Sequence, residues 1–432
     1  MRSTTIRKSP LYKFIQEEEN RQKSNLELIA SENFISSEVR NLCASVLTHK
    51  YAEGYPGKRY YGGCQYIDEV ERYTQDLAKK LFHAEYANVQ PHSGSNANLA
   101  VLHAFLQAND VILGMDLSHG GHLTHGAAVS FSGKFYDAHF YGVDKKTEYL
   151  DYDIIRNIAK KVRPKIIIAG ASSYPRIIDF ASFRDIADEV GALLFVDMAH
   201  IAGLVAVGLH PSPLPHAHVV STTTHKTLRG PRGGMILVGK DMPNIFNITT
   251  KSGRIKNISE LLNNSVIPGV QGGPLMHIIA AKGKSFEEAL QDSFVTYQQN
   301  VLRNSKRLAK ALHEKHGVRI ITGGTDNHIV LADISDFGIT GKKAEILLDQ
   351  AGLTVNKNMI PFDKQGPLVT SGIRLGTPAV TTRGMKEEDM DFIADCIGRI
   401  LCEKEKAVKD VAEEVFQFVQ RYPLFYSDEV VR

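Results

Sequence analysis

The chain has 432 residues, which is too long for one small core and predicts two or three domains, and its composition, 43% hydrophobic and 23% charged, is typical of soluble globular proteins. Its 51 basic and 48 acidic residues nearly balance, so a net charge of +3 gives no reason to expect nucleic acid or a membrane surface as a partner. The four cysteines have neither CxxC nor Cys/His spacing, which predicts free thiols in a reducing compartment rather than a disulfide or zinc framework.

The N-terminal 50 residues are charged and polar, and they predict an arm more than a core. Residues 11–45 have a helical pattern, and the first 22 residues lack the apolar stretch of a secretory signal. No run in the sequence approaches the roughly 18 apolar residues that a membrane span needs. We therefore expect a cytoplasmic protein that begins with an arm over residues 1–50.

From about Val70 the sequence alternates helical patterns with short apolar runs. VERYTQDLAKKLF and NANLAVLHAFL have helical periodicity, whereas DVILGM, KIIIAGAS, ALLFVDMA and HVVSTTT are continuous apolar runs bounded by polar residues or glycine. Runs of this kind are typical of strands that are buried on both faces. The alternation predicts an α/β domain with a largely parallel sheet, which we assign to residues 51–280.

The C-terminal third has a different pattern. Residues 240–275 are polar and irregular, and a long helical pattern follows over roughly 280–315. The remainder mixes a strand-like run, HIVLADI, with the helical patterns GKKAEILLDQA and EEDMDFIADCIGRIL. This mixture predicts a second, smaller α+β domain over residues 281–432, with its boundary near 275–290.

Three predicted strand ends carry unusual residues, and open α/β sheets bind ligands at the carboxyl ends of their strands. Ser93, Gly94 and Ser95 precede a helix and suggest a phosphate site, although such residues are also ordinary helix caps. Asp197 follows four large apolar residues and needs a cationic partner, unless it caps the next helix. Lys226 lies among small hydroxyl residues and glycines, which suits either a flat ligand or a glycine-rich surface turn.

These three features occur in the order that a pyridoxal-phosphate pocket would require. A lysine supplies the Schiff base, an aspartate keeps the pyridine nitrogen protonated so that the ring acts as an electron sink, and a helix N-terminus takes the phosphate. The small residues around Lys226 then have a reason, because a planar ring must lie against them. The three features support one another better than any one stands alone.

The sequence resembles the serine hydroxymethyltransferase family, whose members are fold-type I pyridoxal-phosphate enzymes with an aspartate aminotransferase-like fold. The resemblance runs from LIASEN (28–33) to SGIRLGTPA (371–379). Agreement at separated motifs makes it highly specific. These motifs are KYAEGYPGKRYYGG (50–63), PHSGSNAN (91–98), HGGHLTHG (119–126), VDMAHIAGL (196–204), TTTHKTLRGPRGG (222–234), QGGP (271–274) and VNKN (355–358).

The resemblance implies which residues would hold pyridoxal 5'-phosphate. Lys226 would carry the cofactor covalently, Asp197 would pair with the pyridinium nitrogen, and His122 would stack on one face of the ring. The other contacts would come from Ala199 at the opposite face, Ser172 and His200 at the 3-oxygen, Ser93, Gly94, Ser95 and His225 at the phosphate, and Tyr51, Gly272 and Gly273 of a second subunit. No metal is expected.

The resemblance also implies a substrate site. Arg374 would bind the substrate carboxylate through its planar fork and so orient the bond to be broken, assisted by Ser31 and Tyr61. Glu53 would be the acid–base group at the serine hydroxyl and the folate, and Thr223 is implied as a further catalytic residue. The pterin would face Leu117, Gly120, Gly121, Leu123 and Asn358. Singly, however, such histidines and arginines are more often core or surface residues, and threonines are ordinary in strands.

The implied activity is the reversible conversion of serine and tetrahydrofolate into glycine and 5,10-methylenetetrahydrofolate by a homodimer with shared active sites, with a tetramer also possible. One alternative is a folate-independent aldolase for threonine and other 3-hydroxy amino acids, which would lack the pterin-facing loop LSHGGHLTHG and Asn358. Another is a non-catalytic RNA-binding or scaffolding protein. Such a protein could dispense with Lys226 and Glu53, and the balanced charge gives no RNA-binding footprint.

Overall fold

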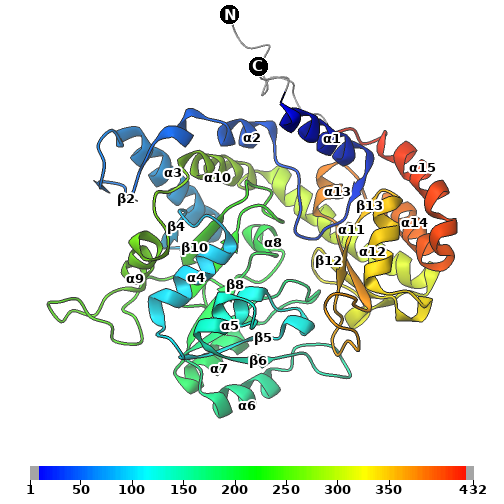
Figure 1. Cartoon of the computed structure of the whole chain (residues 1–432). Coiled ribbons are helices and arrows are strands. Elements are labelled where there is room, and N and C mark those ends of the chain that lie inside the picture. Colours follow the sequence, from blue (N-terminus) through cyan, green and yellow to red (C-terminus); the bar gives the residue numbers. More distant parts are fainter. Residues whose placement is uncertain (1–8, 425–432) are drawn as a thin grey trace, which may run out of the picture.

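The computed structural model describes residues 9–424, and its largest element is a seven-stranded sheet (Figure 1). The strands lie in the order β4-β10-β9-β8-β7-β5-β6, and only β10 is antiparallel to its neighbours. The sheet is therefore mostly parallel, as predicted. Its strands are β4 (Tyr86–Asn88), β5 (Val111–Met115), β6 (Asp137–Tyr141), β7 (Ile166–Ala169), β8 (Leu193–Asp197), β9 (Val219–Thr223) and β10 (Gly234–Val238).

The four apolar runs of the sequence form β5, β7, β8 and β9, and every residue of the last three strands is buried. Successive side chains point to opposite faces of a strand, so Leu194 and Val196 enter one hydrophobic core while Leu193 and Phe195 enter the other. Helices cover both faces of the sheet (Figure 1). They include α3 (Gln65–Phe82), α4 (Gly94–Phe105), α5 (Phe131–Phe135), α6 (Tyr152–Val162), α7 (Phe180–Val190), α8 (Ala202–Ala206) and α9 (Ile258–Asn264).

The carboxyl ends of β4, β5, β7, β8 and β9 lie at one edge of the sheet, because these strands run in the same direction. Two of these ends approach each other closely at Gly170, which has φ +131°, and a Cβ atom there would overlap the carbonyl oxygen of Asp197. Glycine is therefore required at this position. This edge gathers the loops that carry the predicted site residues.

The C-terminal part forms an antiparallel sheet in the order β11-β12-β15-β14, beside the large sheet. The long helical pattern over roughly 280–315 forms two helices rather than one, because Leu290 and Gln291 separate α10 (Met276–Ala289) from α11 (Asp292–His316). The break lets α10 pack against α3 while α11 packs against α14. The elements here are β11 (Arg319–Ile320), β12 (Ile329–Asp333), α12 (Gly341–Gln350), β14 (Asn356–Asn358), β15 (Gly372–Gly376), α13 (Pro378–Thr382), α14 (Asp389–Glu403) and α15 (Val408–Val419).

The N-terminal segment differs from an arm that only covers the surface. Helix α1 (Pro10–Ser24) has no buried residue, but β1 (Leu26–Glu27) pairs in parallel with β13 (Leu353–Thr354). Leu26 and Leu28 are fully buried in the core of the C-terminal part. This short apolar stretch was not recognised in the sequence because it lies between two polar helices, α1 and α2 (Ser37–Cys43).

The first eight residues of the predicted arm, including part of the segment judged not to be a signal, lie outside the described residues. The last eight residues of the predicted C-terminal domain lie outside them as well. Within residues 9–424, no helix combines the length and the apolar character that crossing a membrane would require.

Candidate active site

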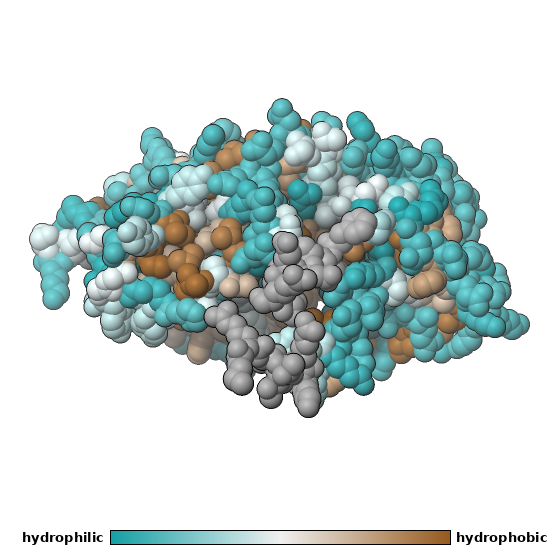
Figure 2. Space-filling view, turned by 90° about the horizontal axis from the view of Figure 1, so that it is seen from above, coloured by the Kyte–Doolittle hydropathy of each residue, from teal (hydrophilic) through white to brown (hydrophobic). Residues whose placement is uncertain are grey.

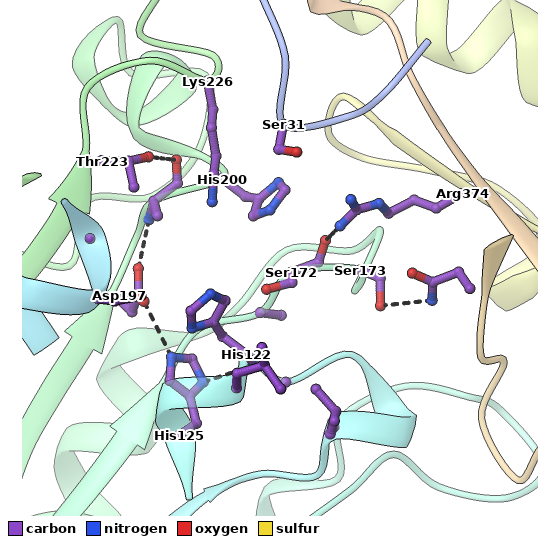
Figure 3. A pocket seen from close by; sticks show the side chains of 18 of the residues that line it. Ser31, His122, His125, Ser172, Ser173, Asp197, His200, Thr223, Lys226 and Arg374 are labelled. Carbon is purple, nitrogen blue, oxygen red and sulfur yellow. Dashed lines mark hydrogen bonds and ion pairs between the residues drawn. The ribbon is translucent and has the colours of Figure 1, made fainter. Parts of the chain in front are cut away.

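A cavity of about 570 Å³ opens at the carboxyl edge of the large sheet, facing β14 and β15 (Figure 3). Its walls come from the loops after β4, β5, β7, β8 and β9, together with the N-terminal segment and the C-terminal sheet. The cavity brings together most of the predicted site residues. These are Ser31, Ser93, Gly94, Ser95, Leu117, Gly121, His122, Leu123, Ser172, Asp197, Ala199, His200, Thr223, His225, Lys226, Asn358 and Arg374.

Lys226 lies in the turn after β9 and is only 8% exposed. Its backbone is fixed, since the side-chain amide of Asn33 donates to the Lys226 carbonyl at 2.9 Å. The ammonium group makes no hydrogen bond or ion pair with any residue between 9 and 424, and burial lowers its pKa to about 8 although Asp197 opposes the shift. A buried amine without a partner and with a lowered pKa is suited to act as a nucleophile. Lys226 is therefore not a solvated surface lysine.

Asp197 ends β8 and is held by three donors. Its carboxylate accepts from Asn98 Nδ2 at 2.8 Å and from the backbone N–H of Ala199 at 3.0 Å, and it lies 3.3 Å from His125 Nε2. Burial alone would raise the pKa of Asp197, but the hydrogen bond and charge of His125 hold it well below its ordinary value. The next helix, α8, begins after Ile201, so Asp197 does not cap it.

Asn98 and His125 were not among the predicted site residues. Asn98 also donates to Thr124 Oγ1 at 2.8 Å and accepts from Ser221 Oγ at 2.6 Å, so its side-chain amide is fully engaged. Both residues lie within motifs that carried the family resemblance, PHSGSNAN and HGGHLTHG. A buried acid at a strand end needs such donors, and their position in these motifs was the available signal.

Two predicted histidines are held neutral inside the cavity. Burial lowers the pKa of His122 to about 4, and its Nδ1 lies 2.7 Å from Thr124 Oγ1. Burial also places the pKa of His200 well below its ordinary value, and its Nδ1 lies 3.3 Å from His328 Nε2. His328 was missed, because a single histidine before a strand gives no sequence signal. Neutral rings suit contacts with a flat heterocycle.

The candidate phosphate end lies at the start of α4. Ser93 caps this helix by accepting from the Asn96 N–H at 3.2 Å, so the alternative prediction of a helix cap is confirmed for Ser93. Ser95 lines the cavity. A Cβ atom on Gly94 would lie 2.7 Å from Thr223 Cγ2, so a larger residue would fill this cradle. His225 Nδ1 is buried without a partner among the described residues. A helix N-terminus, a glycine and a donor nitrogen fit a phosphate group.

Arg374 enters the opposite side of the cavity from β15. It donates to the Ser172 carbonyl at 2.7 Å and to Asn356 Oδ1 at 3.0 Å, as Figure 3 shows for Ser172. Burial lowers its pKa to about 10, so it stays charged at neutral pH. No acidic side chain of the described chain pairs with it. A buried guanidinium that is oriented by two acceptors but lacks an anion suits a carboxylate ligand.

Five predicted residues lie outside the cavity and form a second cluster, consisting of Tyr51, Glu53, Tyr61, Gly272 and Gly273. The rings of Tyr51 and Tyr61 meet edge to face at 5.2 Å, and the Glu53 carboxylate raises the pKa of Tyr61. A Cβ atom on Gly272 would lie 3.4 Å from Glu53 Oε1, and one on Gly273 would lie 3.5 Å from the Tyr51 ring.

Arg59, which was not among the predicted site residues, fixes the backbone of the second cluster. Its guanidinium donates to the carbonyls of Ala52 at 2.9 Å and Gly54 at 2.8 Å, which flank Glu53. Buried Glu71 accepts from the same guanidinium at 2.6 Å. The loop that carries Glu53 therefore has a fixed backbone.

Gly120 is a predicted site residue that supports the cavity from outside it. Gly120 does not line the cavity, but its carbonyl accepts from the Ser172 N–H at 2.7 Å, so it supports the cavity wall.

Ligand atoms of His122, His125 and Asp197 lie within 4.8 Å of one another, a spacing that a metal ion could use. Hydrogen bonds to Thr124 and Asn98 account for this arrangement without an ion.

Comparison with protein families shows that the chain matches a known family over most of its length. The family described as serine hydroxymethyltransferase matches residues 6–397. The matched span includes every residue of the cavity and of the second cluster, and it ends within α14.

Proposed function

The chain belongs to the serine hydroxymethyltransferase family, whose members use pyridoxal phosphate with tetrahydrofolate as co-substrate, and we propose a role for each of its site residues in the family's reaction. The protein is a glycine hydroxymethyltransferase, which reversibly transfers the hydroxymethyl carbon of serine to tetrahydrofolate. The family match gives no support to the aldolase alternative. We infer the roles of individual residues, the oligomer and the compartment from contacts, burial and charge.

Pyridoxal phosphate, when bound, supplies an electron sink for the carbanion left by bond cleavage. We assign covalent attachment to Lys226, on the ground of its buried and unpartnered amine. Asp197 would hold a proton at the ring nitrogen, because its low pKa keeps it an acceptor. The other contacts are assigned to His122 and Ala199 at the ring faces, Ser172 and His200 at the 3-oxygen, and Ser93, Gly94, Ser95 and His225 at the phosphate.

The substrate carboxylate is assigned to Arg374 and Ser31. The observation that carries this assignment is the buried guanidinium without an acidic partner, in the same cavity as the Lys226 amine. Binding the carboxylate there orients the Cα–Cβ bond relative to the cofactor ring. Thr223 lies beside Gly94 and is assigned a supporting catalytic role, and the pterin would face Leu117, Gly120, Gly121, Leu123 and Asn358.

We assign the second cluster to the cavity of a partner subunit in a homodimer. Glu53 would exchange protons with the serine hydroxyl and the folate, Tyr61 would assist at the carboxylate, and Tyr51 with Gly272 and Gly273 would reach the phosphate. The exposure of Tyr51 and Tyr61 supports this assignment. Figure 2 looks onto the face that bears α1 and α2 and shows hydrophobic residues exposed among hydrophilic ones. The exposed hydrophobic side chains of the N-terminal segment include Leu11, Phe14 and Ile15 in α1, and Val46.

We also propose two domains, 51–280 and 281–432, in an aspartate aminotransferase-like fold, and a cytoplasmic location. The four cysteines are unpaired, which supports a reducing compartment.

A spectroscopic experiment tests the assigned activity. The purified protein should be yellow, and glycine followed by tetrahydrofolate should produce a new long-wavelength absorbance band that grows with folate. A band that forms with glycine but does not grow with folate would favour the aldolase. A colourless protein that takes up no pyridoxal phosphate would overturn the assignment of the cavity.

A further inference from the structure

Lys282, on α10, is a buried lysine that the assigned chemistry does not use. It is 1% exposed, and its ammonium group donates to the carbonyls of Val89 at 2.7 Å, Pro91 at 3.1 Å and Gly234 at 2.8 Å. An ammonium group has three donors, whereas a neutral amine has two. Burial lowers the pKa of Lys282 to about 7, and three carbonyl acceptors match the three donors of its charged form, which offsets part of the cost of burying that charge.

The three carbonyls belong to the backbone that leads into the candidate phosphate site. Val89 and Pro91 follow β4 and immediately precede the turn at Ser93, and Gly234 begins β10. The Gly234 N–H donates to the Pro91 carbonyl at 3.0 Å, and a Cβ atom on Gly234 would overlap the Ser93 carbonyl. The Lys282 ammonium thus connects, through hydrogen bonds, the segment after β4 to the start of β10, next to the turn at Ser93.

The same side chain also lies against the turn that carries Lys226. A Cβ atom on Gly233 would overlap Lys282 Cε and would lie 3.0 Å from its Nζ. The Gly233 carbonyl accepts from the Thr224 N–H at 3.1 Å, two residues before Lys226. Lys282 therefore contacts the backbone behind two walls of the cavity without entering the cavity.

A salt bridge does not explain this lysine. Within residues 9–424 it forms no ion pair, and the acid that acts on it through space, Glu71, accepts hydrogen bonds from Arg59 at 2.6 Å and from Gln90 at 2.8 Å. All three of its hydrogen-bond acceptors are backbone carbonyls. Its effect must therefore be on the position of the chain around them.

We propose that Lys282 is a positioning residue for the cofactor phosphate. By holding the carbonyls of Val89, Pro91 and Gly234, it fixes the backbone from which Ser93, Gly94 and Ser95 present their N–H and hydroxyl groups. This inference rests on the proposed phosphate role of Ser93–Ser95.

The test compares pyridoxal phosphate with pyridoxal, which lacks the phosphate. Both are titrated into the full chain after removal of its cofactor, and binding is followed by absorbance. Lys282→Met keeps the length of the side chain but removes its donors, and affinity for pyridoxal phosphate should fall by about tenfold or more. Affinity for pyridoxal should stay unchanged. Equal losses for both ligands, or no loss, would overturn the proposal, because a merely structural lysine does not distinguish the ligands.

Lys284→Met is the matched control. Lys284 lies on the same helix, and its surface ion pairs with Glu38 and Glu287 make the same substitution mild. It should change neither affinity. If Lys282→Met does not fold, Gly233→Ala is tested by the same two titrations. This variant retains Lys282, but the added methyl group would displace the end of the lysine side chain from its three carbonyl acceptors.

Ser95→Ala separates failure of this inference from failure of the phosphate assignment. If Ser93–Ser95 do not bind the phosphate, Ser95→Ala leaves the ratio of the two affinities unchanged. If they do bind it but Lys282 plays no part, Ser95→Ala lowers the ratio and Lys282→Met does not. Support requires that both variants lower the ratio.

Discussion

The cavity and the second cluster differ in exposure although both hold residues assigned to one reaction. In the cavity, Asp197 and Lys226 are 9% and 8% exposed, whereas in the second cluster Tyr51 and Tyr61 are 57% and 48% exposed. Hydrogen bonds fix both regions. Asn98 and His125 contact the Asp197 carboxylate in the cavity, and Arg59 donates to the backbone of the second cluster. The second cluster thus combines a fixed backbone with exposed side chains.

This difference supports the proposal that a second subunit completes the site. An acid and two tyrosines on a fixed loop, displayed at the surface, are preorganised for a group that another molecule brings to them. In a two-fold dimer each cluster would meet the other chain's cavity. Substitutions in the two regions should therefore differ in effect: those in the cavity remove buried contacts as well as activity, whereas those in the second cluster impair activity and leave the fold intact.

Lys226→Ala should have the largest effect. Among residues 9–424, no other lysine lines the cavity, so loss of this one should remove covalent attachment of the cofactor and slow turnover drastically. Turnover and the visible spectrum of the dialysed variant measure this. Near-normal turnover without the covalent link would assign the attachment elsewhere.

Asp197→Asn should rank second in size. The amide keeps the shape of the side chain but carries no charge to hold a proton at the ring nitrogen, so the rate should fall on the order of 10³-fold or more. Cofactor binding, checked by absorbance, should persist. Comparable activity of the variant would leave Asp197 with only a structural role.

Arg374→Lys keeps the positive charge but removes the planar fork. Serine affinity and turnover should both fall, by about tenfold or more, while cofactor absorbance stays intact. Steady-state kinetics with varied serine measures the effect. Normal serine kinetics together with a lost cofactor would instead move Arg374 to the phosphate.

The smallest effect sharpens the contrast in packing. Asn98→Ala removes a buried amide with several partners, so the free energy of unfolding should fall by about 1–3 kcal/mol. Glu53→Gln, on the exposed cluster, should change it by no more than about 0.5 kcal/mol. Chemical denaturation of both variants without cofactor measures this, and equal losses would contradict the distinction between the two regions.

The sequence predicted much of the cavity, because its main residues end strands whose apolar runs are continuous. Runs such as LLFV before Asp197 identify both the strand and the site. The direction of β10 was not predictable, since antiparallel pairing leaves no mark in the run GMILV. The break at Leu290 was missed because the helical pattern continues through it and tertiary packing decides it.

The supporting residues were harder to predict, because their partners are distant in sequence. His328 meets His200 across 128 residues, and Lys282 reaches Val89 across 193. A single histidine or a lysine in a helical pattern carries no signal of such a contact. Arg59 lies within the motif KYAEGYPGKRYYGG, but its role depends on Glu71 in the next helix.

The most direct test of the shared site mixes two inactive chains. Lys226→Ala and Glu53→Gln subunits, each nearly inactive alone, are co-expressed with two different tags so that mixed dimers can be isolated and exchange is demonstrated. If each cavity uses the partner's cluster, one site of a mixed dimer receives both defects and the other receives none. Random equal mixing should then restore about a quarter of wild-type sites, because half of the dimers are mixed and each has one intact site. If each site were built within one chain, every site would keep a defect, and isolated mixed dimers without recovered activity would contradict the shared site.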